Sequence, residues 1–294
     1  MALDITRAWF SYEDHAGQPR CVVTTSDMDL DDASTSPVAY IVDKLTYRQW
    51  QSPSETDWFQ IDFGDDVSIQ CLTVVFARIT SPYRRYDTQE ILPTDTVRHK
   101  LDADGGTPGT GAVFDSGVID SDIDTKRGYH VCALATPVTA RYWRCLIDAP
   151  SRAGEGFFLV MFVQAGPIFQ PAFNHVYGER ISYPDNAALQ RAPSSQAVFV
   201  TRNERTLESQ LIWDFIQQSE RDDWRGMFEY AGSSEPVTFS IASPDADPFT
   251  SVAGPNGWVI EGDKAFVGVF DADLSISSRQ FNASIVQIQM TEHR

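Results

Sequence analysis

Basic residues are scarce in this chain of 294 residues, which has 23 Lys and Arg against 41 Asp and Glu and a formal net charge of -18 at pH 7. Duplex DNA and anionic membrane surfaces are bound mainly through Lys and Arg, which neutralise phosphate. The composition therefore argues against nucleic acid as a partner. It is typical of an acidic, well-hydrated surface.

Cysteine is also rare, and the four residues Cys21, Cys71, Cys132 and Cys145 are far apart. No C-x-x-C pair occurs, which excludes a zinc ribbon and a thioredoxin-type site. Cys71 and Cys145 stand in strand-like runs, where a buried and unreactive thiol is expected. The sequence leaves a disulfide open.

Long apolar runs are missing, since none approaches the roughly 18 to 20 residues that a membrane-spanning helix needs. The first ten residues, MALDITRAWF, contain neither a basic stretch nor a long apolar stretch. We therefore expect no signal peptide and synthesis in a cytoplasm. An apolar fraction of 42% still supports packed cores, and the length allows two modest domains or one large β domain.

Motifs of catalytic sites are missing as well. No G-x-S-x-G, H-E-x-x-H or S-x-x-K arrangement is convincing, and the five histidines show no metal-ligand spacing. The acidic runs Asp27–Asp31 and Asp120–Asp124 begin like EF-hand loops, but Asp32 and Thr125 stand where glycine is required. We expect no catalytic residue, no cofactor and no EF-hand metal site, and leave a calcium ion bound by another kind of loop open.

The first part of the chain is predicted to be β-structure. Apolar and polar residues alternate from residue 57, which predicts a half-buried strand whose inner face is Phe59, Ile61 and Phe63. Gly64 predicts a turn, and Ile69–Phe76 predicts a second strand that is covered on both faces. Further short strands are expected at Arg20–Thr25, Val113–Phe114 and Tyr142–Ile147. This spacing is typical of a β-sandwich or jelly roll over residues 1–166.

The pattern changes after residue 166. Prolines interrupt residues 167–198, which predicts an extended linker or arm. Thr206–Gln218 has apolar residues at helical spacing and is predicted to be the main helix, with a second short helical turn over Glu220–Tyr230. Strands are expected at Val237–Ile241, Trp258–Glu261, Ala265–Phe270 and Phe281–Met290. Residues 199–294 should therefore form a smaller α+β domain in a mainly β protein, with one long helix on an antiparallel sheet.

Two loops contain candidate contact residues. Trp50 precedes the first long strand, and a second cluster consists of Tyr83, Arg84, Arg85 and Tyr86. Tyrosine beside arginine suits stacking on a sugar, cation–π contact or a protein interface. We expect glycan or partner contact at these residues. The alternative is that Trp50 fills one end of the sandwich and the tyrosine–arginine segment is a plain surface loop.

Several short motifs, in their order, resemble discoidin-type, galactose-binding-like domains. They are Asp43, Thr46, Trp50–Ser52, Trp58–Gly64, Asp115-Ser116-Gly117 and Arg141-Tyr142-Trp143-Arg144. The resemblance covers about half of the chain. It implies a β-sandwich of a kind whose usual work is recognition of sugars or surfaces.

The second half resembles tail-tip proteins of long-tailed bacteriophages and gene-transfer particles. The motifs are Met161–Gly166, Phe169-Gln170-Pro171, Asn174, Tyr177-Gly178, Thr206–Gln218, Asp247-Pro248-Phe249 and Phe281–Met290. The resemblance implies a structural, non-enzymatic virion component of the tail tip or baseplate, assembled as a symmetric homo-oligomeric ring.

The same resemblance implies contacts with the tail tube, the hub or the tape measure protein. An assembly arm would include Phe169, Pro171, Asn174 and Tyr177, since extended segments and strand edges are suited to pairing with a neighbouring subunit. Host-surface glycans are a further expected partner. The alternative function is a carbohydrate-binding accessory module of a bacterial surface or hydrolase system.

Overall fold

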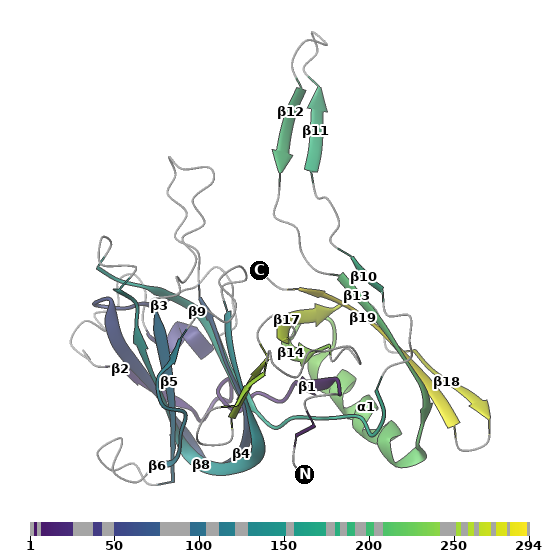
Figure 1. Ribbon diagram of the computed structural model, residues 1–294, viewed down its shortest axis with the longest axis horizontal. Helices are drawn as coiled ribbons and strands as arrows, with labels where there is room; N and C mark the ends of the chain where they lie inside the picture. Colours follow the sequence, from purple (N-terminus) through teal and green to yellow (C-terminus); the bar gives the residue numbers. More distant parts are fainter. Residues whose placement is uncertain are drawn as a thin grey trace. The chain divides into compact units, whose positions relative to one another are not determined.

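The computed structural model describes residues 3–4, 7–25, 38–42, 50–76, 95–103, 112–120, 129–150, 156–174, 180–182, 187–191, 198–202, 208–241, 251–253, 258–261, 265–271, 275–280 and 283–292. Its backbone is mainly antiparallel β-structure, as Figure 1 shows, which confirms the expected fold class. Contacts divide the chain into two compact units. Unit 1 is Met1–Pro171 with Thr238–Phe266, and unit 2 is Ala172–Val237 with Val267–Arg294.

Residues 238–266 therefore group with unit 1, although the sequence placed them in a domain at 199–294. The reason is strand pairing across a long stretch of sequence. The elements of unit 1 are β1 (Trp9–Ser11), β2 (Val22–Thr25), the 3-10 helix η2 (Val38–Val42), β3 (Trp50–Gln51), β4 (Thr56–Phe76), β5 (Thr96–Asp102), β6 (Ala112–Asp115), β7 (Ile119–Asp120), β8 (Tyr129–Asp148), β9 (Leu159–Gly166), β14 (Val237–Ser240), β15 (Ser251–Ala253) and β16 (Trp258–Glu261). Within unit 1, β14 pairs with β1, and β16 pairs with β8.

The framework of unit 1 is the antiparallel pair of its two long strands, β4 and β8 (Figure 1). The first half of β4 lies between β2 and β8, and β5 continues this layer on the other side of β8. The second half of β4 lies between β8 and β9. A register shift between Asp62 and Val67 separates the two halves, so that the same two strands contribute to both layers of the sandwich.

The prediction of a turn at Gly64 is therefore wrong. Gly64 has φ of 82°, a left-handed conformation that glycine adopts without steric cost, but it lies inside the bulge of a continuous strand. The bulge bends the strand without ending it, because pairing with β8 resumes at Val67.

One apolar cluster fills the space between the two layers. Phe59, Ile61 and Phe63 are fully buried, as their alternation with polar residues predicted. Trp143 on β8 packs edge-on against Phe59, with ring centroids 5.4 Å apart. Burial of such side chains supplies most of the driving force for folding.

The outer face of the second layer is also covered, as predicted for Ile69–Phe76. Thr73 on β4 and Thr238 on β14 share a hydrogen bond of 2.9 Å between their hydroxyl oxygens. The Thr238 hydroxyl donates to Oε1 of Gln164 on β9, and the Gln164 amide donates to the carbonyl of Ser11 on β1. This buried chain of hydrogen bonds holds β1 and β14 against β4 and β9.

The end of β9 lies very close to the segment that follows β1. A Cβ atom placed on Gly166 would stand 1.8 Å from the carbonyl oxygen of Glu13, so only glycine fits. Next to this contact, the carboxylate of Asp14 accepts a hydrogen bond of 3.1 Å from the backbone N–H of Ala165.

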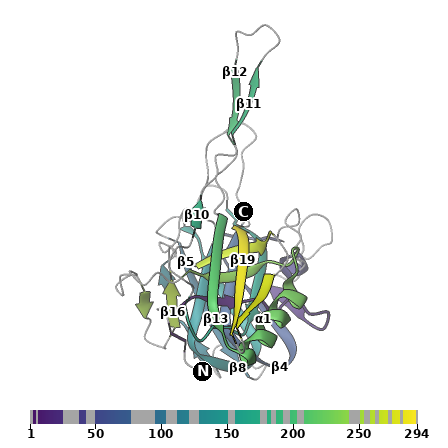
Figure 2. The same cartoon turned by 90° about the vertical axis from the view of Figure 1, so that its right-hand side faces the viewer.

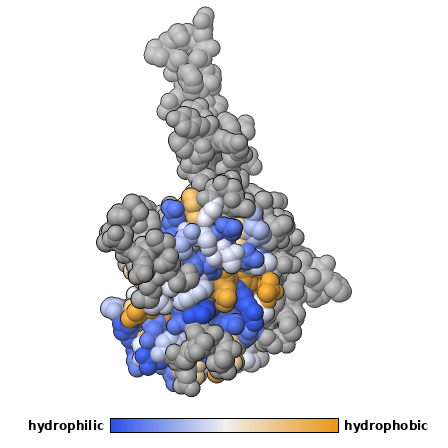
Figure 3. Space-filling model, turned by 90° about the vertical axis from the view of Figure 1, so that its left-hand side faces the viewer, coloured by the Kyte–Doolittle hydropathy of each residue, from blue (hydrophilic) through white to orange (hydrophobic). Residues whose placement is uncertain are grey.

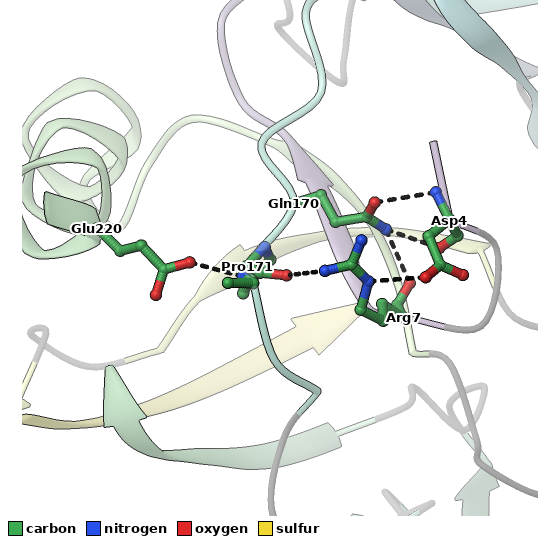
Figure 4. Close-up of polar contacts among 6 residues, drawn as sticks. Asp4, Arg7, Gln170, Pro171 and Glu220 are labelled. Atoms are coloured by element: carbon green, nitrogen blue, oxygen red, sulfur yellow. Dashed lines mark hydrogen bonds and ion pairs between the residues drawn. The ribbon is translucent and has the colours of Figure 1, made fainter. Parts of the chain in front are cut away.

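Beyond β9 the chain runs along the N-terminal segment (Figure 4). The side-chain amide of Gln170 accepts from the backbone N–H of Asp4 and donates to the carbonyl of Asp4. Arg7 donates to the carboxylate of Asp4 at 3.0 Å and to the carbonyl of Pro171 at 3.3 Å. The N-terminal segment thus binds the residues after β9 through both backbone and side-chain groups.

Unit 2 is an antiparallel sheet with one helix among its described residues (Figure 2). Its elements are β10 (Arg180–Ser182), β11 (Ala187–Arg191), β12 (Val198–Arg202), β13 (Glu208–Ile216), α1 (Gln218–Ala231), β17 (Ala265–Phe270), β18 (Ser275–Gln280) and β19 (Ala283–Glu292). β13 pairs with β10 and β19, and β19 also pairs with β17 and β18. β11 and β12 pair with each other.

Helix α1 packs on this sheet through aromatic side chains. Trp224 lies 4.9 Å from Trp213 of β13, and Phe228 stacks on Phe270 of β17 at 4.3 Å, measured between ring centroids. At the start of the helix, Glu220 accepts a hydrogen bond of 2.6 Å from the backbone N–H of Ala172 (Figure 4). α1 is too short and too polar to cross a membrane, and no described helix meets that requirement.

The helix predicted at Thr206–Gln218 is wrong, because residues 208–216 form strand β13. Ser209, Leu211 and Trp213 are buried while Ile212 between them is exposed, which is the period of a strand. Pairing with β19 then outweighs the helical spacing of the apolar residues. The helix begins at Gln218 and covers the segment expected to hold only a short helical turn, with Trp224 buried.

Candidate functional site

Trp50, expected as a contact residue, is a core residue. Its side chain is 2% exposed, and its ring packs edge-on against Phe59 and Phe158 at centroid distances of 6.1 and 5.6 Å. No ring face is left for stacking on a ligand. The structure agrees with the alternative reading of Trp50 as the residue that fills the end of the sandwich.

The other predicted contact residues are placed only in part. The cluster Tyr83–Tyr86 and Tyr177 lie outside the described residues, as do the aspartates of residues 27–31. Phe169 of the predicted arm is bound to its own chain, since its backbone exchanges hydrogen bonds of 2.7 and 2.8 Å with Phe10. Pro171 and Asn174 are described, and a role of these residues in assembly stays a prediction.

The cysteines are free thiols, and three of the four are buried. Burial raises the pKa of Cys71 to about 12 and also raises the pKa values of Cys132 and Cys145. A protonated, buried thiol is a poor nucleophile and a poor metal ligand. No group of three or more metal-ligating side chains occurs in the part of the chain that the structure describes.

A polar surface remains on the outer face of the first layer of the sandwich. Along β4, β5 and β8, the side chains between the core residues point away from the core, because successive residues of a strand face opposite sides. The register places Gln60 of β4 and Lys100 of β5 on either side of Arg144 of β8. One step along, Asp62 and Asp102 stand on either side of Tyr142.

We call six of these side chains the outer-face patch. They are Trp58, Gln60, Lys100, Asp102, Tyr142 and Arg144. Figure 3 views the molecule from the side of β2, β5 and β6 in Figure 1, and the described surface there is mostly hydrophilic, with smaller apolar areas. Because the patch is built on three paired strands, its side chains are held at a fixed spacing.

Arg144 and Trp58 form the centre of this patch. The guanidinium carbon of Arg144 lies 3.8 Å from the centroid of the Trp58 ring, a cation–π contact. The Nε atom of Arg144 donates a hydrogen bond of 3.2 Å to Oε1 of Gln60. Both contacts fix the plane of the guanidinium group, and burial lowers the pKa of Arg144 from its ordinary value.

Two ion pairs border the outer-face patch. Arg98 donates two hydrogen bonds to Asp115, at 2.8 and 2.5 Å, and Arg141 donates two to Asp62, at 2.8 and 3.0 Å. These hydrogen bonds lower the pKa values of Asp115 and Asp62, so both carboxylates are ionised at neutral pH. Both carboxylates are therefore already paired with an arginine.

Asp102 differs from them. Its side chain is 7% exposed, and its Oδ1 atom has no hydrogen-bond partner among the residues that the structure describes. A buried carboxylate oxygen without a donor is unfavourable, typically by about 1–3 kcal/mol or more. Such an atom commonly marks a place where a ligand or water donates a hydrogen bond.

A buried polar network lies on the core side of the same strands. The indole N–H of Trp143 donates to Nδ1 of His99 at 3.2 Å. An indole can only donate, so His99 carries its hydrogen on Nε2 and donates it to Nδ1 of His130, 3.2 Å away. Burial lowers the pKa of His99 well below its ordinary value and that of His130 to about 4, so both rings are neutral at pH 7.

This network supports the patch, because His99 precedes Lys100 on β5 and Trp143 precedes Arg144 on β8. The hydrogen bond between the two core side chains ties together the strands that present the two cations. The sequence showed the alternation of Trp58 and Gln60 with the core residues and the Arg141–Arg144 motif. It did not show that these segments and β5 lie side by side, which depends on the strand register.

Comparisons with known proteins give similarity at the level of structure only. No protein-family model and no curated protein matches the chain. Among solved structures, a chitosan-binding module of a Paenibacillus chitosanase/glucanase is 14% identical, covers 53% of this chain and 99% of its own, and has a TM-score of 0.36. At these values, no property of the module is carried over to this chain.

Two modules of Clostridium perfringens are similar at the same level. One is a family 32 carbohydrate-binding module in complex with GalNAc-β-1,3-galactose, with 10% identity, 53% and 100% coverage and a TM-score of 0.37. The other is a family 32 module in complex with galactose, with 10% identity, 52% and 97% coverage and a TM-score of 0.35.

Proposed function

We propose that unit 1 is a non-catalytic binding module that holds a saccharide on the outer-face patch. The observation that carries this proposal is that an acceptor without a described donor and a cation without a described carboxylate partner lie on adjacent strands of one face. Oδ1 of Asp102 accepts no hydrogen bond among the described residues, and no described carboxylate lies within ion-pair distance of Arg144. A sugar hydroxyl can accept a hydrogen bond from the terminal amino groups of Arg144, and the Asp102 carboxylate beside them is an acceptor for hydroxyl or water donors.

The remaining side chains of the patch support the same ligand class. Trp58 supplies an aromatic surface, and Gln60 and Tyr142 supply an amide and a hydroxyl on adjacent strands. Saccharide sites typically combine an aromatic surface with a few oriented polar groups. We therefore propose a glycan partner that binds at the outer-face patch and not at Trp50.

Binding of the whole chain to a panel of neutral and acidic oligosaccharides, measured by glycan array and then by calorimetry, tests the proposal. We expect Trp58→Ala and Asp102→Ala each to weaken the tightest ligand about tenfold, which corresponds to the loss of one good contact. Arg225→Ala is the matched control, because Arg225 lies on α1 in unit 2 with 52% of its side chain exposed. Failure of the unaltered chain to bind any member of the panel would reject the proposal.

A tail-tip role is the second candidate function. The sequence motifs of the second half favour it, and two of the expected strands of that resemblance correspond to β9 and β19. In this proposal the chain is made in a host cytoplasm and becomes a virion component, in contact with tail tube, hub or tape measure proteins. Negative-stain images of the purified chain should then show a symmetric ring. A monomer at every concentration would contradict the ring.

A further inference from the structure

The outer-face patch places two positive charges directly opposite each other. Lys100 on β5 and Arg144 on β8 are register partners in an antiparallel pair. Like charges in this position are destabilising, because the Cβ atoms of opposing residues are only about 4.5–5.5 Å apart. With 41 acidic and 23 basic residues in the chain, composition does not make such a pair unavoidable.

The carboxylates nearby neutralise this pair only in part. Asp115 uses both oxygens for Arg98, and its distance of 3.9 Å from Nζ of Lys100 is at the outer limit of an ion pair. Arg144 has no carboxylate within 4.0 Å among the described residues. Asp102 acts on Arg144 only at longer range, as a diagonal neighbour across the two strands.

The guanidinium group of Arg144 is also held in a fixed plane. Trp58 lies against one of its faces, and Gln60 binds its Nε atom, so the terminal amino groups form the part that is left for a ligand. A planar guanidinium matches a planar carboxylate, to which it can donate two parallel hydrogen bonds. Lys100 offers a second positive charge on the opposite strand.

We propose that the saccharide bound by the outer-face patch is a uronate, whose carboxylate lies between Lys100 and Arg144. This inference rests on the proposed function of unit 1 and names the ligand class of the same site. Hydroxyl groups of the same sugar unit donate to Asp102, which keeps the ligand carboxylate away from that acidic side chain. The aromatic surface of Trp58 contacts the sugar ring.

The test compares an oligouronate with the neutral oligosaccharide of the same linkage and with its sulfated form, by calorimetry on the whole chain. We expect the unaltered chain to bind the oligouronate about tenfold more tightly than the neutral form, as expected for one charge-assisted contact. This preference should shrink at high salt, because screening weakens interactions with exposed charges. Lys100→Met should abolish the preference, whereas Lys100→Arg should keep it.

The results separate the uronate assignment from the proposal of a saccharide site. Equal binding of the neutral form and the oligouronate overturns the uronate assignment and leaves the saccharide site standing. Tighter binding of the sulfated form contradicts the proposal that the site recognises a planar carboxylate. Binding of none of the three overturns the saccharide site as well. If Lys100→Met fails to fold, the salt dependence of the unaltered chain still decides, since a preference that is insensitive to salt contradicts a contact between charges.

Discussion

The cores of the two units contain different kinds of side-chain contact. In unit 1 the core between the layers includes a hydrogen-bonded series of polar rings, Trp143, His99 and His130, among its apolar side chains. In unit 2 the described contacts between α1 and the sheet are aromatic, with Trp213 against Trp224. An apolar contact tolerates small shifts, whereas a hydrogen-bonded series needs every partner in place.

The difference between the two cores bears on the proposed function of unit 1. Two members of the polar network of unit 1, His99 and Trp143, alternate along β5 and β8 with the side chains proposed to bind a saccharide. The hydrogen-bonded core side chains thus fix the strands that carry the proposed binding surface. In unit 2 the helix contacts the sheet through aromatic packing.

The largest expected effect comes from removing the indole at one end of the unit 1 network. Trp143 is fully buried, and Trp143→Ala should lower the free energy of unfolding of unit 1 by about 3–5 kcal/mol. Trp224→Ala, an equally buried change, is the matched substitution in unit 2. Chemical denaturation followed by residue-specific hydrogen exchange should assign each loss to its own unit. Equal loss of protection in both units from either change would contradict the division.

The second-largest expected effect is a loss of stability of the unit 1 core in acid. The pKa of His130 is lowered from 6.5 to about 4 in the folded state, so the unfolded chain binds more protons between these two values. Stability conferred by the neutral ring is therefore present above pH 6.5 and is lost as pH falls toward 4, by about 3 kcal/mol for this one group. Denaturation curves at several pH values measure the slope.

The control for this prediction is His130→Leu, which removes the titrating ring. The variant is expected to be less stable at neutral pH, because His99 loses its acceptor. Its stability should nevertheless depend less steeply on pH between 6.5 and 4. An unchanged slope would show that other groups cause the acid sensitivity. The histidines of unit 2, His175 and His293, lie outside the described residues.

The smallest effects come from two glycines that should respond in opposite directions. Gly166→Ala in unit 1 places a Cβ atom against the backbone of Glu13 and should destabilise by about 1–3 kcal/mol. Gly226→Ala in α1 meets no atom within 4 Å and should stabilise by about 1 kcal/mol, because alanine favours the helix interior. Thermal denaturation measures both. Two changes of the same sign would contradict the assigned environments.

Part of unit 1 was predictable because the first half of β4 alternates strictly between buried and half-exposed residues. Phe59, Ile61 and Phe63 are core residues, as their period of two indicated. The error at Thr206–Gln218 has a clear origin, since its apolar residues fit a helix and also an alternating strand. Residues 208–216 became a strand because β19 offered a partner, which a local pattern cannot reveal.

The candidate site shows the same limit more sharply. Trp50 was expected at a surface because aromatic residues in loops often bind ligands, but Phe59 and Phe158 enclose it. The side chains of the outer-face patch were visible as polar positions of separate strands. Their convergence could not be foreseen, because Lys100 and Arg144 are far apart in the chain and meet only through the register of β5 and β8.

The sequence by itself determined the strand-rich character of the chain, the inner faces of its best strands and its acidic balance, because these follow from local periodicity and composition. Only the tertiary structure decided which strand became the partner of which. That choice put Trp50 in the core, turned a helical pattern into β13 and set Lys100 opposite Arg144. The physical reason is that pairing depends on hydrogen bonds between distant segments, and these form only when the whole sheet is assembled.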